Sequence, residues 1–442
     1  MHNLKILLIN PLMTNDCETP LGLLYIATKL KSERFNVSVL DLSFSRKLSY
    51  FKRILSTEKP DVVGFTVMST TYPTVKQLSA YIKNKYRDTV IILGGPHPTL
   101  FPQEVLENKD INMVVIGEGE DNFGRILQNI IEKKMAFDGI EGIGFKHNGK
   151  LIINNKTVRL DLNSLPFPDR TFIFYKDYAV RMARNQMFGH RTLNIMASRG
   201  CAFNCSFCQP VIKKIFGEQV RLREPENIVD EITEMVDKYN ISGIWFSDDN
   251  FTYNKEWIHK ICGQIIDRKL KVFWSCNSRV DTVDENLIKH MSEANCIQIR
   301  YGVESGSQLF LDKSNKGIKI KQTEDAFYLT KKHRINTWAY VMLGGPYETK
   351  DTFEETKNLL RRLKPVHIQL TYTTPLPGTY LEKEIMAFNS IKRVSFRLED
   401  IELHSKYILD SPNLRRWRVI LMKIIFRLEL PFYNKKRAIF RT

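Results

Sequence analysis

Short apolar runs alternate with amphipathic stretches along the first 150 residues of the chain. Buried strands of a parallel sheet are nearly continuous apolar runs, whereas surface helices repeat apolar positions every three or four residues. The runs that predict strands lie at residues 5–10, 37–41, 62–65, 90–93 and 113–116. Helical patterns fall between them near 21–32, 72–86 and 120–133, and a strand pair is expected near 142–154. This alternation predicts a doubly wound, Rossmann-like parallel sheet over residues 1–154.

A second series of strands and helices follows a proline-punctuated stretch. Residues 155–190 contain Pro166 and Pro168, which disfavour regular structure, so this stretch is interpreted as a linker. Six further strand-like runs lie at 193–197, 243–246, 272–276, 297–303, 338–342 and 367–371. They predict a partial (β/α)6 barrel of the TIM type over residues 191–382, with site residues at the carboxyl ends of its strands. The fold class is therefore α/β, and residues 383–442 are expected to form a basic helical region.

Three cysteines, Cys201, Cys205 and Cys208, lie within eight residues at the end of the first barrel strand. Three thiolates on one loop can hold three irons of a cubane iron–sulfur cluster and leave the fourth iron open. Zinc binding or core packing is the alternative. A structural zinc site usually brings its ligands as two separated pairs, and the sequence contains no second C-x2-C pair. The remaining cysteines are single, and most of them lie in apolar runs typical of a core: Cys17, Cys262, Cys276 and Cys296.

The spacing C-x3-C-x2-C, with aromatic Phe207 before the last cysteine, resembles the motif of the radical S-adenosylmethionine (SAM) enzymes. The resemblance implies that the amino and carboxylate groups of SAM bind the open iron of a 4Fe-4S cluster. It also implies that an electron from the reduced cluster cleaves SAM to a 5′-deoxyadenosyl radical. An electron donor such as flavodoxin or ferredoxin is then an expected partner.

Polar loops after the later barrel strands support this resemblance. Ser247, Asp248 and Asp249 follow the second strand, where carboxylates could accept hydrogen bonds from the SAM ammonium group. Radical SAM enzymes often carry a Gly-Gly-Glu-like sequence at this place, so the acidic pair departs from their pattern. A turn or a helix N-cap is the alternative interpretation of these residues.

Further candidates follow the third, fourth and fifth strands. Asn277 and Arg279 end the third strand, and a planar guanidinium suits the SAM carboxylate, although a surface salt bridge would also explain it. The resemblance places contacts to the ribose and methionine at Glu304 and Ser305. Small residues after the fifth strand would let the backbone approach adenine, or simply form a tight turn: Gly344 and Gly345.

The first domain carries polar residues and glycines directly after its strands. Ligands of open α/β sheets bind beyond the carboxyl ends of the strands, and glycines let a bulky cofactor approach the backbone. The candidate cofactor-binding residues are Thr66, Ser69, Thr70, Gly94, Gly95, His97, Gly117, Glu118 and Gly119. Over residues 1–380 this organisation is similar to the radical SAM class with an N-terminal cobalamin-binding domain. That class includes methyltransferases and the anaerobic cyclase of chlorophyll biosynthesis.

One motif of many cobalamin proteins is missing. The sequence Asp-x-His-x-x-Gly, which supplies a lower axial histidine in those proteins, does not occur in the chain. His97 is the nearby candidate, and it is interpreted as a structural residue of its loop. Class members without the motif are expected to bind cobalamin without a protein histidine, or in some cases not to need it. A sheet domain that has lost its ligand is the alternative.

The net charge of +17 suggests anionic partners. Transfer-RNA methylthiotransferases resemble this barrel, but they carry three further cysteines in the N-terminal domain, where this chain has Cys17 alone, and a C-terminal RNA-binding barrel. Nucleic acid is therefore not an expected partner. The seven cysteines form no disulfide framework, and neither a membrane-spanning run nor a secretory signal is present, so a cytoplasmic location is expected.

Residues 414–430 form a basic amphipathic pattern near the C-terminus. Its basic side consists of Arg415, Arg416, Lys423 and Arg427. Its apolar side consists of Leu414, Trp417, Leu421, Ile424, Ile425 and Leu428. Docking of this helix on the barrel mouth is the favoured interpretation. Peripheral contact with an anionic membrane is the alternative.

The resemblance leads to one functional expectation, beside which three alternatives are kept. The expected activity is cobalamin-dependent methylation of an unactivated carbon in a small-molecule or lipid-like substrate. Oxidative cyclisation or rearrangement by the same class is the first alternative. A transfer-RNA methylthiotransferase is the alternative from a different class, and a non-catalytic electron-transfer or zinc-binding protein is the third. The sequence identifies neither the substrate nor a residue that acts on it as an acid or base.

Overall fold

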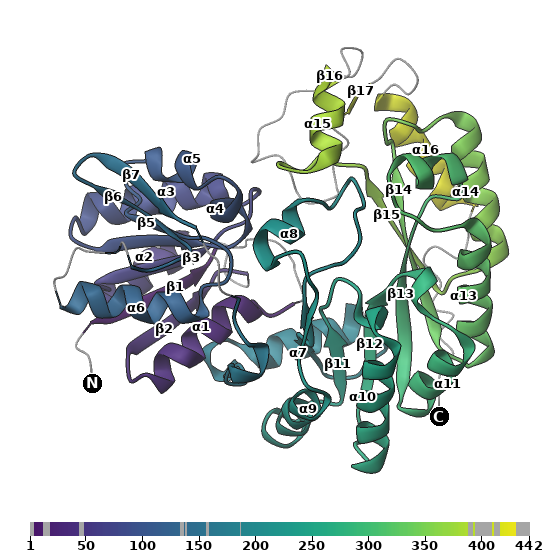
Figure 1. Cartoon of the computed structure of the whole chain (residues 1–442), viewed down its shortest axis with the longest axis horizontal. Coiled ribbons are helices and arrows are strands. Elements are labelled where there is room, and N and C mark those ends of the chain that lie inside the picture. Colours follow the sequence, from purple (N-terminus) through teal and green to yellow (C-terminus); the bar gives the residue numbers. More distant parts are fainter. Residues whose placement is uncertain are drawn as a thin grey trace. The chain divides into compact units, whose positions relative to one another are not determined.

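The computed structural model describes residues 4–11, 18–43, 48–132, 137, 139–155, 159–185, 187–387, 392–393, 409–410 and 416–429. The chain forms two compact units (Figure 1). The first consists mainly of Met1–Tyr178 and includes Val211–Gln219. The second consists mainly of Val220–Arg397 together with Ala179–Pro210.

The described residues of the first unit contain a sheet of order β2-β1-β3-β4-β5-β6-β7. Its parallel strands correspond to the five predicted runs: β1 (Lys5–Asn10), β2 (Asn36–Asp41), β3 (Val62–Thr66), β4 (Val90–Gly94) and β5 (Met113–Val115). The predicted strand pair forms β6 (Ile143–His147) and β7 (Lys150–Asn154), which extend the sheet in antiparallel fashion. The predicted α/β fold of this region is confirmed.

Helices cover both faces of this sheet, and each face has its own apolar core. Ile6 and Leu8 face α1 (Leu21–Ser32) and α6 (Glu120–Ile131). The opposite face, with Leu7 and Ile9, is covered by α2 (Leu48–Glu58), α3 (Tyr72–Lys85) and α5 (Pro102–Glu107). Because successive strand residues point to opposite faces, a single apolar run supplies both cores.

Three helices that connect the strands of this sheet were not predicted. In α2, the fully buried apolar residues are Phe51 and Leu55, so its apolar stripe is narrow. Helices α4 (Pro96–Leu100) and α5 have only five and six residues. Such short helices do not display a full apolar repeat, and the prolines that begin them resemble turn signals.

The stretch interpreted as a linker contains more regular structure than predicted. It forms the short helices η1 (Leu162–Ser164) and η2 (Arg170–Phe172), followed by α7 (Tyr175–Asn185). The carboxylates of Asp161 and Asp169 accept hydrogen bonds from backbone amides and cap the two short helices. The prolines precede η2 and α7, so they separate these elements without preventing them.

The second unit contains a parallel sheet whose strands follow one another in chain order. The strands are β8 (Thr192–Ile195), β11 (Gly243–Phe246), β12 (Phe273–Ser278), β13 (Cys296–Glu304), β14 (Asn336–Leu343) and β15 (His367–Tyr372). The long crossover helices are α9 (Pro225–Tyr239), α10 (Lys255–Asp267), α11 (Glu285–Glu293), α13 (Ile320–Lys332) and α14 (Lys350–Leu363). Strands β8 and β15 form the two edges and do not pair, so the predicted partial barrel is confirmed.

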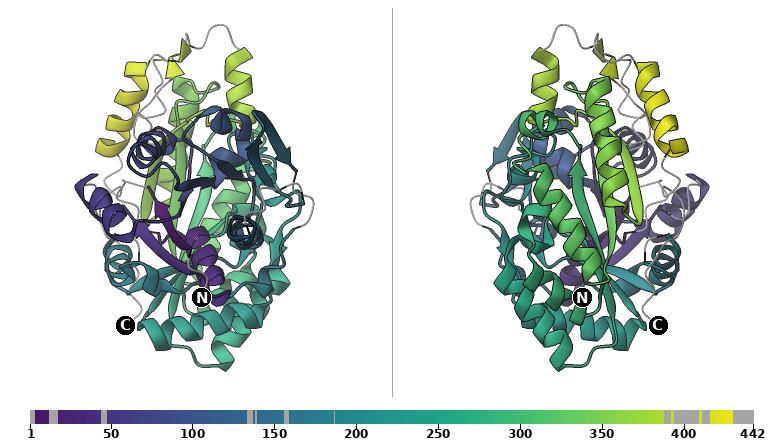
Figure 2. Two further views of the ribbon diagram at one scale, coloured as in Figure 1. Left: turned by 90° about the vertical axis from the view of Figure 1, so that its left-hand side faces the viewer. Right: turned by 90° about the vertical axis from the view of Figure 1, so that its right-hand side faces the viewer.

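The second unit also contains α15 (Tyr380–Ala387), the short pair β16 (Lys392–Arg393) and β17 (Leu409–Asp410), and α16 (Arg416–Glu429). Helix α16 packs against α14 (Figures 1 and 2), where the rings of Phe426 and Phe353 are 5.2 Å apart. The buried side of α16 consists of Val419, Met422 and Phe426. None of the described helices is long and apolar enough to cross a membrane.

The prediction of which side of α16 is buried is wrong. Trp417, Leu421 and Ile424 are exposed, although the sequence pattern placed them on the packing side. The helix has apolar residues on more than one side, and the position of Phe353 on α14 selects which of them is covered. Leu414 and Arg415 lie outside the described residues.

Candidate functional site

The three neighbouring cysteines lie on the loop that follows β9 (Ser198–Arg199), just after the first barrel strand. The Cys205 carbonyl accepts hydrogen bonds from the amides of Cys208 and Gln209, both at 3.0 Å. This turn places Cys205 and Cys208 one helical turn apart. Cys205 is buried, Cys201 is half-buried and Cys208 is exposed.

Neighbouring segments of the second unit hold this loop through its backbone. The amide of Ser206 donates to the carbonyl of Ser314, at 2.9 Å, just after α12 (Gln308–Lys313). At the start of α15, the Leu381 amide donates to the Ser206 carbonyl, also at 2.9 Å. The loop is therefore fixed from two sides before any metal binds.

The three thiols fit a cluster better than a single metal ion. Among the described residues, no three His, Cys, Asp or Glu side chains converge on a point where one ion could be held. In a cubane each cysteine binds a different iron, so its ligands need not converge. Burial raises the pKa of the Cys201 thiol, so cluster assembly must release its proton. The other described cysteines are fully buried core residues, as predicted: Cys262, Cys276 and Cys296; Cys17 lies outside the described residues.

The two aspartates after β11 have different environments. Asp248 is buried and accepts hydrogen bonds from the Ser198 hydroxyl at 2.5 Å and the Ala197 amide at 3.2 Å. It therefore anchors the backbone that leads into the cysteine loop. Asp249 is exposed, and no hydrogen bond to its carboxylate is found among the described residues. Burial raises the pKa of Asp248 to about 6. Ser247, the third candidate here, is half-buried.

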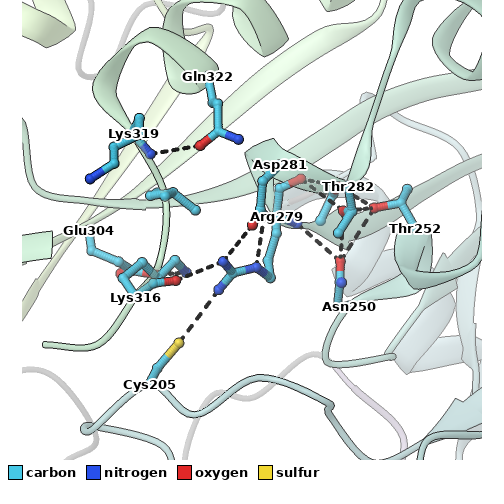
Figure 3. A network of polar contacts seen from close by, with 12 residues as sticks. Cys205, Asn250, Thr252, Arg279, Asp281, Thr282, Glu304, Lys316, Lys319 and Gln322 are labelled. Carbon is cyan, nitrogen blue, oxygen red and sulfur yellow. Dashed lines mark hydrogen bonds and ion pairs between the residues drawn. The ribbon is translucent and has the colours of Figure 1, made fainter. Parts of the chain in front are cut away.

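Arg279 lies next to the cysteine loop (Figure 3). Its guanidinium donates to both carboxylate oxygens of Asp281, at 2.9 and 2.8 Å, and to the Lys316 carbonyl at 2.7 Å. It also points Nη1 at the Cys205 sulfur, 3.6 Å away. Close by, Asn250 Nδ2 and Asn277 Oδ1 are buried and have no hydrogen-bond partner among the described residues. Buried polar atoms that lack a protein partner indicate room for a polar ligand.

A buried ion pair lies beneath the same site. Lys316 Nζ is 2.8 Å from Glu304 Oε1, and both side chains are largely buried. Glu304 ends β13 with a φ of 61°, which non-glycine residues rarely adopt. A Cβ on Gly302 would lie 2.6 Å from the Glu304 carboxylate and 2.7 Å from Lys316 Nζ, so only glycine leaves space for this pair. The Ser305 hydroxyl is engaged with Thr356 at 3.1 Å.

The glycine pair after β14 is shaped by a buried carboxylate. Glu348 accepts hydrogen bonds from the amides of Gly344 and Gly345. Gly344 has a φ of 78°, and a Cβ on Gly345 would lie 2.7 Å from the Phe310 ring. Phe207 lines a small cavity next to this turn, together with Met342, Pro346, Tyr347 and Thr373. The fifth-strand loop therefore approaches the cysteine loop.

We expect Glu348 to make the second unit less stable as the pH rises. Burial raises its pKa to about 7, so the folded state keeps a proton that the unfolded chain loses above pH 4.5. Stability is therefore full below pH 4.5 and falls by about 3 kcal/mol up to pH 7. Urea unfolding of Glu348→Gln at pH 5 to 8 should show a flatter profile than the wild type. The exposed Glu226→Gln variant is the control, and a profile for Glu348→Gln that parallels it would contradict this role.

Lys316 and Glu348 were missed at the level of the sequence. Lys316 lies among several lysines of a polar segment, and Glu348 precedes a helix in the position of an ordinary cap. The one signal in the sequence for a role in the site was that each of them follows a predicted barrel strand. Glu348 closely follows the candidate glycines after β14, whereas Lys316 follows β13 only after the intervening helix α12.

The candidate residues of the first unit gather at one edge of its sheet. Strands β3, β4 and β5 are parallel neighbours, and Thr66 pairs with Gly94 at the ends of the first two. Ser69 and Thr70 follow β3, and the Thr70 hydroxyl is buried with no hydrogen-bond partner in the part of the chain that the structure describes. The loop after β5 contains the remaining candidates: Gly117, Glu118 and Gly119. Such an edge, with an unsatisfied hydroxyl, suits a polar ligand.

Two glycines of this edge have conformations or contacts that demand glycine. Gly95 has a φ of 98°, and a Cβ there would lie 3.0 Å from the backbone of Val67. Gly117 has a φ of 73°, and its amide donates to the Thr99 hydroxyl at 2.8 Å. The two loops therefore pack closely against each other.

His97 is a core residue of the first unit. Its side chain is almost completely buried, between Tyr72 at 4.2 Å and Phe101 at 5.2 Å between ring centroids. Its Nδ1 forms a hydrogen bond with the Ser69 hydroxyl at 3.1 Å, and no described residue forms a hydrogen bond with its Nε2. Burial lowers the pKa of His97 to about 4, so the ring is neutral at pH 7.

Comparisons with known proteins agree with this geometry. Residues 195–360 match the Radical SAM superfamily, and residues 14–127 match the B12 binding domain. An uncharacterised methyltransferase of Pyrococcus horikoshii is 31% identical over 383 residues, which cover 86% of this chain and 81% of the relative. The anaerobic magnesium-protoporphyrin IX monomethyl ester cyclase of Rubrivivax gelatinosus is 28% identical over 374 residues, or 83% of this chain and 66% of the cyclase.

Among solved structures, the radical SAM methyltransferase TsrM of Kitasatospora setae, with cobalamin and a [4Fe-4S] cluster bound, has the same fold. Its TM-score is 0.73 at 18% identity, over 89% of this chain and 77% of TsrM. The three cysteines and the sheet edge of the first unit fall within the two matched regions. The chain therefore belongs to the radical SAM superfamily, in the group with an N-terminal B12-binding domain, and its cofactors are a 4Fe-4S cluster, SAM and cobalamin.

Proposed function

We propose that this radical SAM enzyme methylates an unactivated carbon of a small-molecule or lipid-like substrate. The observation that carries this proposal is the similarity to a relative named as a methyltransferase, which extends over both units. When bound, the cluster and SAM supply a carbon-centred radical, and cobalamin supplies the methyl group. The protein contributes positioning and exclusion of water. A small acidic electron carrier such as flavodoxin or ferredoxin is the proposed source of the electron.

Different described residues are candidates for binding the cluster, for binding SAM and for excluding water. Cys201, Cys205 and Cys208 hold the cluster. Asp249 is the better candidate for the SAM ammonium group, because the oxygens of Asp248 are already occupied by Ser198 and Ala197. The unsatisfied atoms of Asn250 and Asn277 are candidate contacts for the polar parts of SAM. Phe207 and the apolar residues of its cavity would keep water from the reacting atoms.

The product decides between methylation and its main alternative. Anaerobically reconstituted protein is incubated with isotopically methyl-labelled SAM, cobalamin, reductant and candidate substrates. Transfer of the label to carbon supports methylation. A product that lacks the label and has lost hydrogen would instead indicate oxidative cyclisation, which the similarity to the Rubrivivax cyclase keeps as the second candidate.

We expect cobalamin to bind without a histidine ligand from the protein. His97 is buried between two aromatic rings, and withdrawing it would break its hydrogen bond to Ser69. Purified His97→Gln protein should therefore take up cobalamin, and its cob(II)alamin EPR spectrum should match that of the wild type. Nitrogen superhyperfine splitting in the wild type that disappears in His97→Gln would contradict this expectation. The acid stability of the variant offers a separate check, because the wild type loses stability as the pH falls from 6.5 towards 4.

The exposed side of α16 supports peripheral binding to an anionic membrane. Trp417, Ile420, Leu421 and Ile424 form a stripe at helical spacing and are 40% to 60% exposed. Residues 411–442 contain nine basic residues and one acidic residue. Apolar side chains beside excess positive charge are typical of helices that lie in a membrane surface.

Vesicle sedimentation tests this surface. Full-length protein should bind vesicles that contain phosphatidylserine, and Trp417→Glu/Ile424→Glu should bind about tenfold more weakly. Ile266→Glu, which alters an equally exposed apolar residue on α10, should bind like the wild type. Equal binding by all three proteins would contradict a membrane role for α16.

A further inference from the structure

The guanidinium of Arg279 is fixed by contacts that leave little capacity for another ligand. Four of its five N–H groups donate hydrogen bonds. Nε and Nη2 each donate one to the Asp281 carboxylate, and Nη2 donates a second one to the Lys316 carbonyl. Nη1 donates one to the Cys205 sulfur. The side chain is 6% exposed. A SAM carboxylate, which favours a bidentate approach, would have to displace Asp281.

The same guanidinium also contacts the cysteine loop through an aromatic ring. Its central carbon lies 3.7 Å from the centroid of the Phe203 ring, within stacking distance. Phe203 and Cys205 are two residues apart on the loop, and Arg279 contacts the loop at both positions. Rotation of the guanidinium away from the sulfur would break the stacking as well as the ion pair with Asp281.

We propose that Arg279 is a positioning residue for the iron–sulfur cluster, which raises its reduction potential through a charge-assisted hydrogen bond to Cys205. A donor and a positive charge at a ligand sulfur stabilise the state with more negative charge, which is the reduced cluster. Burial strengthens this effect because little water screens it. Asp281 opposes it by partly neutralising the guanidinium.

This role concerns a one-electron step. The oxidised cluster accepts one electron from an external reductant, and no bond in Arg279 or Cys205 forms or breaks. Because the measurement needs neither cobalamin nor substrate, its result does not depend on the proposed methyl transfer.

The test is a redox titration of full-length protein, reconstituted with iron and sulfide and kept free of SAM. The reduced fraction is followed by EPR at a series of fixed potentials. In Arg279→Gln the ratio of reduced to oxidised cluster at a fixed potential should fall about tenfold, which corresponds to about 59 mV. Arg279→Lys keeps the charge but loses the fork, so it should lie between Arg279→Gln and the wild type.

A second variant predicts a shift of the opposite sign. Asp281→Asn removes the neutralising carboxylate, so the reduced fraction at a fixed potential should rise. Arg268→Gln is the matched control, because it breaks an Arg–Asp pair on the surface, with Asp230. Its titration should coincide with that of the wild type.

Two results would overturn the proposal. One is a titration of Arg279→Gln or Asp281→Asn that coincides with that of Arg268→Gln. The other is an unchanged titration of Arg279→Gln together with weakened SAM binding, which would assign the guanidinium to the SAM carboxylate. If Arg279→Gln fails to assemble a cluster, the direction of the shift in Asp281→Asn decides alone.

Discussion

Replacing Cys205 by alanine is expected to abolish cluster assembly and the formation of 5′-deoxyadenosine together. Cys205 is the buried member of the three cysteines and the one that Arg279 contacts. Two thiolates leave a second iron of the cubane without a protein ligand, and a cluster held in this way does not persist. The measurement is the visible absorbance after anaerobic reconstitution, followed by chromatography of the nucleoside products of SAM with reductant.

A matched control separates loss of a ligand from loss of a buried thiol. Cys262→Ala removes a fully buried cysteine from α10 and should retain both signals. Circular dichroism of the two variants should show the same fold, since the backbone of the loop is held by Ser314 and Leu381 independently of the thiol. A Cys205→Ala protein that still forms 5′-deoxyadenosine would contradict the assignment of this loop to the cluster.

The strands of both units could be predicted from the sequence because parallel strands are buried on both faces. Strand β1 was predicted at its observed bounds, and β13 differs by one residue at each end. Short helices such as α4 gave no such signal, because five residues do not complete a repeat. The buried side of α16 depends on the neighbouring Phe353, which no local pattern contains.

The same difference between local patterns and long-range contacts applies to the candidate site. The three cysteines are neighbours in the chain, so their spacing alone predicts a cluster ligand set. The environment of Arg279 depends on Cys205, 74 residues away, and the pairing of Lys316 with Glu304 depends on the turn between them. The local sequence alone suggests a SAM contact for Arg279, whereas its guanidinium is occupied by contacts with Asp281, Cys205 and Lys316.

Replacing Lys316 by methionine is expected to destabilise the second unit by about 3–5 kcal/mol. The change leaves the Glu304 carboxylate buried without its cation, next to a backbone that already has a positive φ. Burial alone would lower the pKa of Lys316, but the negative charges of Glu304 and Cys205 raise it above the ordinary value. The lysine is therefore charged in the folded protein.

The control is a second lysine–glutamate pair, on the surface of the same unit. Lys332 lies 2.5 Å from Glu285, and both side chains are about half exposed, so Lys332→Met should change stability by less than about 1 kcal/mol. Urea unfolding can be followed by fluorescence, since all five tryptophans belong to the second unit. The double variant Glu304→Gln/Lys316→Met should recover most of the loss, because no unpaired charge remains buried. Equal effects of Lys316→Met and Lys332→Met would show instead that water reaches Glu304 and that the pair beneath the site is not buried in solution.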